Sequence, residues 1–301
     1  MTDVVVVGSA NADLVVEVPR RPAGGETLLG SDLVVHPGGK GANQAAASAR
    51  AGGATRLVAC FGDDGNGAFL RERLEAADVD LGGVWMVDRP TGTAIILVTP
   101  DGENSIVVSP GANGALDVAA VEADESGWAD ARVLVLSMEI PAATVDHAAA
   151  AAAARGIRVV LNAAPARPLP PETLAVCDPL IVNEHEARTL LGREADGFEG
   201  LAQGLLDAGA RSVVITLGAD GALFADAGGI RREPGRLVRV VDTTGAGDAF
   251  VGATACELAR GAALDEAVRF AVAMSALTVG ARGAQSSYPD RSVVERFLAA
   301  G

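Results

Sequence analysis

Short runs of apolar residues recur along the chain, and each is closed by a glycine, a polar residue or a turn. The first is VVVVG at 4–8. A continuous apolar run of this length is typical of a strand that is buried on both faces of a parallel sheet. The strands predicted in this way lie at 4–8, 56–62, 131–137, 156–163, 179–183 and 212–218.

Segments with helical patterns lie between these runs. GANQAAASARAG (41–52) is rich in alanine and ends at glycine, and GAFLRERLEAADV (67–79) repeats apolar residues at helical spacing. PAATVDHAAAAAAARG (141–156) begins with proline and ends in Arg-Gly, which are common start and stop signals of a helix. Strands that alternate with helices predict βαβ units, so we expect a mostly parallel sheet with helices on both faces.

Two stretches depart from this alternation. Residues 13–39 read as short strands with turns, and residues 91–111 contain two β-rich runs joined at Pro100-Asp101-Gly102, a hairpin signal. We expect both stretches to pair into a small sheet that projects from the main body. An exposed apolar face on it needs a cover, either a substrate or a second subunit. The residues assigned to that face are Leu14, Val16, Val34, Ile96 and Val98.

The composition fits one large aliphatic core. The chain has 301 residues, of which 49% are hydrophobic and only 3% aromatic, so the core is built from Ala, Val and Leu. We find no internal repeat and no low-complexity linker. The sequence therefore predicts a single α/β domain over 1–301, with a β lid formed by about 13–36 and 92–108.

Charge and cysteine usage narrow the class of partner and the compartment. The net charge of −15 argues against nucleic acid or an anionic membrane as the main partner, so a phosphorylated ligand needs local positive groups. Cys60, Cys177 and Cys256 show no paired spacing, which indicates a reducing cytoplasm without disulfides or a zinc site. No basic leader or membrane-spanning stretch is evident, and we expect a cytoplasmic protein.

The stretch VDTTGAGDAF (241–250) places a glycine turn and Asp248 where a helix is expected to begin. One interpretation is an ordinary helix start capped by Asp248. The other is that the free N–H groups of Gly245, Ala246 and Gly247 hold an anion such as a transferring phosphate, with Asp248 directed at the same place. This stretch alone leaves both open.

Two common nucleotide-binding motifs are not present. A Walker A loop needs Ser or Thr after Gly-Lys, but GGKGAN (38–43) has glycine after Lys40. A dinucleotide fingerprint needs glycine at its third position and a location after the first strand, but GAGDAF has Phe250 there and lies near the C-terminus. A dehydrogenase is therefore disfavoured.

GGKGANQA (38–45) and VDTTGAGDAF (241–250) resemble the two signatures of the ribokinase family of sugar kinases, also called the PfkB family. The resemblance covers essentially the whole chain and implies a ribokinase-like three-layer αβα sandwich, with a mostly parallel central sheet and a small β-sheet lid. Supporting motifs occur in the same order at 8–15, 62–67, 100–113, 183–187, 216–221 and 280–287.

The resemblance implies that Asp248 is the catalytic base. A sugar hydroxyl is a poor nucleophile, and a positioned carboxylate can accept its proton as the phosphoryl group arrives. The amides of Gly245, Ala246, Gly247 and Asp248 would form the anion hole. The sugar-binding residues implied by the family are Asn11, Asp13, Gly39, Lys40, Asn43 and Glu139.

Each sugar-site position also has an ordinary structural explanation. Asn11 and Asp13 could form an Asx turn that leaves a strand. Gly39, Lys40 and Asn43 could simply start a helix. Glu139, at a strand end, could be a solvated surface residue.

The resemblance also assigns the nucleotide and cation sites. ATP would contact Asn183, Thr216, Gly218, Asp220, Gly221 and Gly247, and Glu186 would bind Mg²⁺ through water. The alternatives are helix capping by Asn183 and Glu186 and a plain hairpin turn at 216–221. We expect the adenine contact at Val272 to be apolar. A monovalent cation, K⁺ in the family, would be held by Asp242, Thr244, Thr278, Ala281, Gly283 and Ser287.

The implied reaction moves the γ-phosphoryl of ATP to the primary hydroxyl of D-ribose in a homodimer that is paired through the β lid. A sibling kinase acting on deoxyribose, another sugar or a nucleoside shares all the catalytic parts and remains an alternative. A non-catalytic sugar or nucleotide sensor is a second alternative, although a sensor has no need of Asp248. The turn at 19–27 is longer than usual for the family, which would alter how the lid closes.

Overall fold

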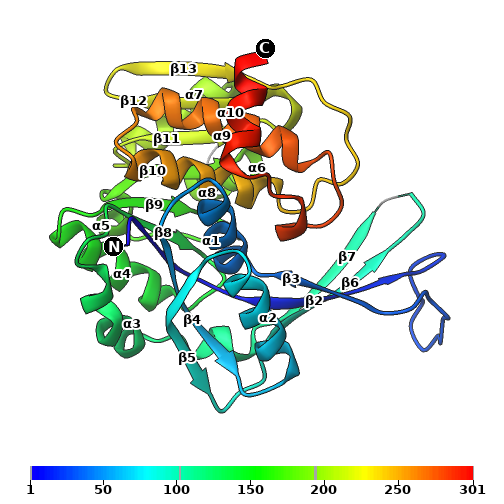
Figure 1. The fold of residues 1–301 in the computed structure, drawn as a ribbon. Helices are drawn as coiled ribbons and strands as arrows, with labels where there is room; N and C mark the ends of the chain where they lie inside the picture. The colour runs from blue at the N-terminus through cyan, green and yellow to red at the C-terminus, as the bar shows by residue number, and fades with distance from the viewer. Residues whose placement is uncertain (1, 102, 193–194, 301) are drawn as a thin grey trace.

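The computed structural model describes residues 2–101, 103–192 and 195–300, and within them the main sheet has nine strands (Figure 1). Neighbours from β11 to β5 are parallel, and β12 and β13 are antiparallel additions at one edge. The order is β13 (Gly229–Pro234), β12 (Gly221–Asp226), β11 (Val213–Thr216), β10 (Cys177–Asn183), β9 (Arg158–Asn162), β8 (Val133–Ser137), β1 (Val4–Val7), β4 (Thr55–Gly62) and β5 (Asp80–Val87).

The six apolar runs correspond to β1, β4, β8, β9, β10 and β11, so the prediction of a mostly parallel sheet is confirmed. Their side chains alternate between two separate cores. In β1, Val4 and Val6 face one core while Val5 and Val7 face the other. Because both faces of these strands are buried, the sequence shows a continuous apolar run instead of alternation.

Helices cover both faces of the main sheet. The first face is covered by α1 (Lys40–Arg50), α2 (Gly65–Glu75), α8 (Ala246–Ala259), α9 (Leu264–Thr278) and α10 (Arg291–Ala300). The second face is covered by α3 (Val118–Asp124), α4 (Ala142–Ala154), α5 (Pro171–Leu174), α6 (Glu184–Leu191) and α7 (Gly197–Asp207). None of the helices in the described part of the chain is both long and apolar enough to cross a bilayer.

Helices α1 and α8 pack unusually closely. A Cβ added at Gly252 would lie 2.5 Å from the carbonyl oxygen of Gln44 and 2.7 Å from Cβ of Ala47, so only glycine permits this approach. The contact brings the first turn of α8, which carries Asp248, close to the first two turns of α1, which carry Asn43 and Gln44.

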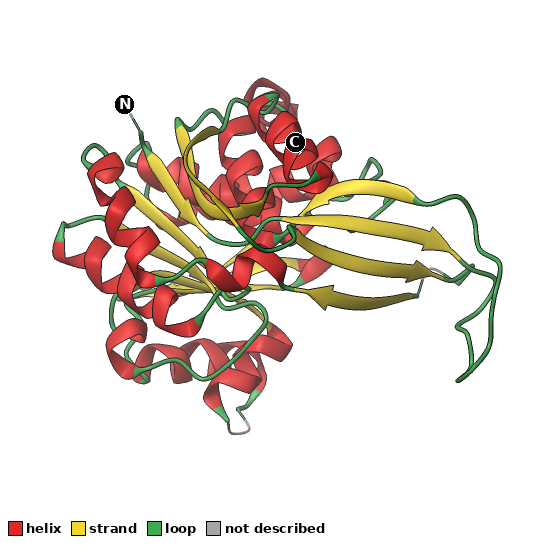
Figure 2. Cartoon of the chain, turned by 90° about the horizontal axis from the view of Figure 1, so that it is seen from below, coloured by secondary structure: helices red, strands yellow, loops and turns green. Residues whose placement is uncertain are grey.

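A second sheet projects from the side of the α/β body (Figure 2). Strands β2 and β6 are parallel, and the two outer pairs are antiparallel, with β6 and β7 forming the predicted hairpin. The order is β3 (Val34–Gly38), β2 (Asn11–Glu17), β6 (Gly92–Val98) and β7 (Asn104–Ser109). The predicted small sheet is therefore confirmed, and we call it sheet B.

The apolar face assigned to sheet B from the sequence was wrong. Leu14 pairs with Val35 and Ile95, whereas Val34 pairs with Val15, so Leu14 and Val34 point to opposite faces. Both faces carry exposed apolar side chains. On the face shared with Asp13 these are Val34, Ile106 and Val108, and on the other face they are Val35, Ile95 and Val107.

Candidate active site

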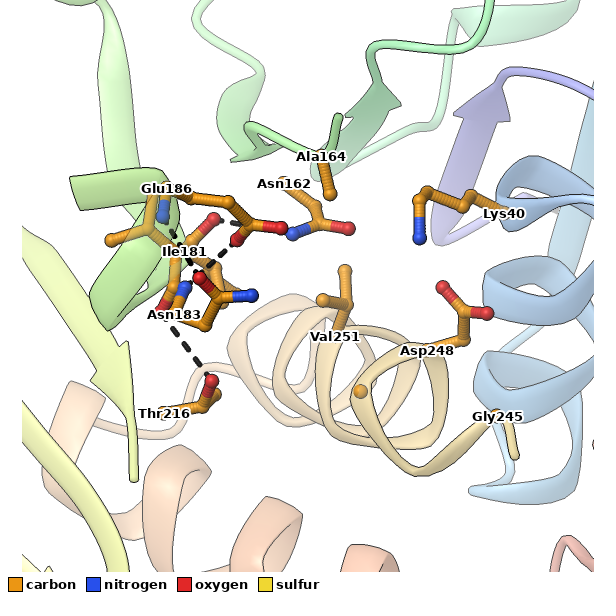
Figure 3. A pocket seen from close by; sticks show the side chains of 12 residues that line it. Lys40, Asn162, Ala164, Ile181, Asn183, Glu186, Thr216, Gly245, Asp248 and Val251 are labelled. Atoms are coloured by element: carbon orange, nitrogen blue, oxygen red, sulfur yellow. Dashed lines mark hydrogen bonds between the residues drawn. The ribbon is translucent and has the colours of Figure 1, made fainter. Parts of the chain in front are cut away.

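The candidate site lies where the parallel strands of the main sheet end. Open α/β sheets bind ligands outside the carboxyl ends of their strands. Asn162, Asn183 and Thr216 are the last residues of β9, β10 and β11, and they line a cavity of about 200 Å³ (Figure 3). The other polar side chains in its lining are Lys40, Glu186 and Asp248.

Asp248 is the third residue of α8 and is not its N-cap. The capping position belongs to Gly245, whose φ of 76° is in the left-handed region that favours glycine. The interpretation of Asp248 as an ordinary cap is therefore wrong, and its side chain points toward the cavity (Figure 3).

The start of α8 supplies free backbone donors. The amide of Ala246 is hydrogen-bonded to the carbonyl of Thr243 at 3.3 Å. The amides of Gly245, Gly247 and Asp248 have no acceptor within the described residues. A Cβ added at Gly247 would meet nothing within 4 Å, so the space beside this residue is open. Free amides at a helix start form a site that suits an anion.

Two amide side chains of α1 hold the carboxylate of Asp248. Its Oδ2 accepts from Nδ2 of Asn43 at 2.9 Å, and its Oδ1 accepts from Nε2 of Gln44 at 3.0 Å. Burial raises the pKa of Asp248, while the charge of Lys40 and the two hydrogen bonds oppose the rise without cancelling it. A carboxylate with a raised pKa is a stronger base, as proton abstraction requires.

Lys40 is the positive group of the site. Burial alone would lower its pKa, but the surrounding carboxylates, led by Asp248 and Glu139, raise it, so the ammonium stays charged. Its ammonium group points toward the carboxylate of Asp248 (Figure 3). Within the described part of the chain it makes no ion pair shorter than 4 Å. It is therefore available to an anionic ligand.

The predicted sugar residues gather at the junction of the two sheets. Asn11 lies at the start of β2, and its Oδ1 accepts from Nδ2 of Asn113 at 2.7 Å. Asp13 follows on the same face, and its carboxylate lies directly against Gly38. Burial and the nearby carboxylates of Glu139 and Asp248 raise the pKa of Asp13 to about 7. Neither residue forms an isolated Asx turn, because both belong to a paired strand.

Glu139 joins the turn after β1, which contains Ser9, to the start of α1 at Lys40. Its Oε2 accepts from Oγ of Ser9 at 2.6 Å and from the amide of Lys40 at 3.1 Å. The alternative of a freely solvated Glu139 is therefore wrong. Gly39 is the N-cap of α1 with φ of 85°, and an added Cβ would lie 2.6 Å from the amide nitrogen of Asn11. The helix start and the sugar-site turn are the same structure.

A second cavity of about 430 Å³ adjoins the first. Thr216 and Gly247 line both cavities, and Gly218, Gly221 and Val272 line the second. Its walls are mainly apolar, as expected at Val272. Asp220, by contrast, is exposed in the turn of Gly218–Asp220 and is not part of the lining.

The predicted nucleotide residues also have the structural roles considered from the sequence. Asn183 and Glu186 form a capping box at the start of α6, with both hydrogen bonds at 2.8 Å. Gly221 has φ of 92° and follows the turn between antiparallel β11 and β12. Asn183 and Glu186 still line the first cavity, and Gly221 lines the second, so capping and turn formation leave these residues available to a ligand.

The residues predicted to bind a monovalent cation come from two loops that Asp242 holds together. Its Oδ1 accepts from the amide of Thr244 at 2.9 Å and from its hydroxyl at 2.6 Å. Its Oδ2 accepts from the amide of Gly283 at 2.8 Å. Burial alone would raise the pKa of Asp242, but these hydrogen bonds lower it, so the carboxylate stays negative. The second loop also contains Ala281 and Ser287 and follows directly after Thr278 at the end of α9.

Several side chains at the site were not predicted from the sequence. They are Ser9, Gln44, Asn113, Asn162 and Gln285. Asn162 could have been found, because it closes an apolar strand at the carboxyl edge of the sheet. The others lie within the motifs at 8–15, 38–45, 100–113 and 280–287, but the sequence assigns them no role, because they reach the site only through contacts between distant segments.

The fold and the site define a phosphotransferase that acts on an alcohol group. The chain belongs to the pfkB family of carbohydrate kinases, whose profile matches residues 1–291. It is 38% identical to a ribokinase of Haemophilus influenzae over 97% of both chains.

Solved structures of ribokinases are also similar to this chain. The Thermotoga maritima ribokinase matches with a TM-score of 0.92 and 36% identity, covering 99% of this chain and 100% of the other. Arabidopsis thaliana ribokinase complexed with ribose and ATP matches with a TM-score of 0.90 and 35% identity, covering 99% of both chains. The predicted family and fold are therefore confirmed.

Proposed function

We propose that the chain transfers the γ-phosphoryl group of ATP to the primary hydroxyl of D-ribose, giving ribose 5-phosphate and ADP. The observation that carries this proposal is the position of Asp248. It lies beside amides at the helix start that have no acceptor among the described residues and close to Lys40, where the sugar-side residues meet the apolar cavity. ATP is a cytoplasmic substrate, so we place the reaction in the cytoplasm.

Each group then has a role in the transfer. Asp248 accepts the proton of the sugar hydroxyl. At the same time the hydroxyl oxygen bonds to the γ-phosphorus, and the bond between this phosphorus and the bridging oxygen of ADP breaks. The amides of Gly245, Gly247 and Asp248, together with Lys40, stabilise the charge on the phosphoryl oxygens. Asn11, Asp13, Gly39, Asn43 and Glu139 orient the sugar.

Mg²⁺ fits the nucleotide side of the site. Glu186 offers a carboxylate and Asn183 an amide at the first cavity, and oxygen ligands are what Mg²⁺ prefers. Within the described residues, no group of three His, Cys, Asp or Glu side chains could hold a metal. We therefore propose that Glu186 binds the ion through water, with the ATP phosphates as its main ligands. When bound, the ion would neutralise part of the negative charge of the ATP phosphates.

A monovalent cation fits the loops joined by Asp242. The proposed ligands are the carboxylate of Asp242, the hydroxyl of Ser287 and the carbonyls of Thr244, Thr278, Ala281 and Gly283. A cation there would fix the loop that precedes α8 without touching the substrate. K⁺ is the proposed ion because a large, weakly hydrated cation suits carbonyl ligands.

Assay of ADP release across a panel of sugars and nucleosides tests the proposed activity. With ATP and Mg²⁺ we expect turnover to be fastest with D-ribose, and faster in KCl than in an equal concentration of NaCl. If kcat/KM were greater with 2-deoxyribose, another sugar or a nucleoside than with ribose, that compound would be the acceptor instead of ribose. No turnover with any acceptor, together with sugar or nucleotide binding, would instead indicate a sensor.

We propose that sheet B acts as the lid of a single functional domain and pairs two chains into a homodimer. Ile106 and Val108 are 57% and 50% exposed on the face shared with Asp13, and exposed apolar side chains grouped in this way often mark a protein–protein contact.

Replacing Ile106 with aspartate should therefore give a monomer by light scattering, because a charge at an apolar interface stays unpaired. The matched variant Ser105→Asp is on the opposite face and should remain dimeric. A wild-type monomer at working concentration, or an Ile106→Asp dimer, would contradict pairing through this face.

A further inference from the structure

Gln44 is a buried polar residue to which the proposed mechanism assigns no role. It lies in the alanine-rich helix α1 and is 0% exposed. Its Nε2 donates both to Oδ1 of Asp248 and to Oδ1 of Asn162, each at 3.0 Å. Its Oε1 is buried and has no hydrogen-bond partner among the described residues. An unsatisfied buried oxygen costs stability, so it calls for an explanation.

The orientation of the Gln44 amide follows from the charge on Asp248. If the amide were reversed, Oε1 would face two other oxygens, Oδ1 of Asp248 and the side-chain Oδ1 of Asn162. Only the present orientation directs a donor at the ionised carboxylate. The unsatisfied Oε1 is thus the consequence of holding Asp248 in its ionised form.

The contact also ties the base to the main sheet. Asn162 ends β9, and its Nδ2 donates to the carbonyl of Ile181 at 3.2 Å. Gln44 therefore connects Asp248 on α8, through Asn162, to the carboxyl ends of β9 and β10. Asn43 makes the corresponding connection on the other side, since its Oδ1 accepts from Nε2 of Gln285 at 3.0 Å.

We propose that Gln44 is a positioning residue, which fixes the carboxylate of Asp248 toward the acceptor hydroxyl and favours its ionised form. This inference rests on the proposed kinase function. Gln44 lines neither of the two cavities, so in this proposal it acts only through Asp248. The other charged or titratable groups that act on Asp248 come from other positions, namely Lys40, Asp13, Glu139, Glu186 and Tyr288.

The variant Gln44→Met tests this role, because methionine has a similar volume and helix preference but no donor. Loss of the donor raises the pKa of Asp248. The acidic limb of the kcat/KM profile should therefore move to higher pH. At neutral pH, kcat should fall about 10- to 100-fold, since a misplaced base loses its geometry. The KM for ATP should stay within about twofold.

The control is Ser48→Ala, one turn further along the same helix. Ser48 is equally buried and accepts from Oγ1 of Thr55 at 2.9 Å, with no connection to Asp248. We expect it to lower the melting temperature and to leave the pH profile unchanged. If Gln44→Met does not fold, Gln44→Leu takes its place, because leucine is also apolar, lacks a donor and is a good helix former. The acidic limb should again move to higher pH.

The results separate this inference from the proposed function. If the wild-type protein were inactive, the proposed function would be wrong, and this inference would lose its basis. A wild-type enzyme active on ribose and a Gln44 variant with the same pH profile would overturn the positioning role alone. A shifted acidic limb in the Gln44 variant, with an unshifted limb in Ser48→Ala, supports it.

Discussion

Replacing Asp248 with asparagine is expected to lower kcat about 100- to 10,000-fold, the usual contribution of a general base. Asparagine keeps the shape of the side chain but cannot accept the hydroxyl proton. The KM for ATP should change little, because the helix amides and Lys40 remain in place. Steady-state ADP release with ribose and ATP measures both constants.

The fold should survive this substitution. One oxygen remains to accept a hydrogen bond from Asn43 or Gln44, while the new amide meets the other donor. The loss of one hydrogen bond is partly offset by removal of a buried charge, so the free energy of unfolding should change by about 1–2 kcal/mol at most. Asp130→Asn, at an exposed position, is the matched control and should have wild-type activity. If the Asp248→Asn enzyme were as active as the wild type, Asp248 could not be the general base.

The main sheet could be predicted from the sequence because its strands are buried on both faces. Runs such as VVVVG are short, bounded by glycine and rich in β-branched residues, and these features together favour a buried strand over a helix. Strand β5 escaped prediction for the opposite reason. It is an edge strand with two glycines and with Trp85 and Met86 40% and 50% exposed, so it carries no continuous apolar run.

The site was predicted as a set of motifs but not as a network. Resemblance identified Asp248, Lys40 and Asn183, which the fold brings to one cavity. It could not show that Asn43 and Gln44 hold the carboxylate, because those contacts span more than 200 positions of sequence. The face of sheet B was assigned wrongly for a related reason. A shift of one residue in strand pairing reverses every side chain, and the sequence did not give that pairing.

Alanine substitution at Gly247 and at Gly245 should have opposite effects on stability, and the two variants together test the anion site directly. Gly247 is in the first turn of α8, and a Cβ there meets no atom within 4 Å. Alanine is also the better helix former, by about 0.5–1 kcal/mol. Gly247→Ala should therefore be as stable as the wild type or more so. Its methyl group would lie where the phosphoryl oxygens approach, and kcat should fall about 100-fold.

Gly245→Ala should instead damage the turn. Gly245 has φ of 76°, and its added Cβ would lie 2.6 Å from Cβ of Ala284 and 2.8 Å from Oη of Tyr288. The left-handed backbone and the clash together should lower the free energy of unfolding by about 1–3 kcal/mol. Thermal unfolding and ADP release, measured on both variants, separate the two effects. Wild-type kcat in Gly247→Ala would mean that the phosphoryl group does not approach this amide, and the anion site would then have to lie elsewhere.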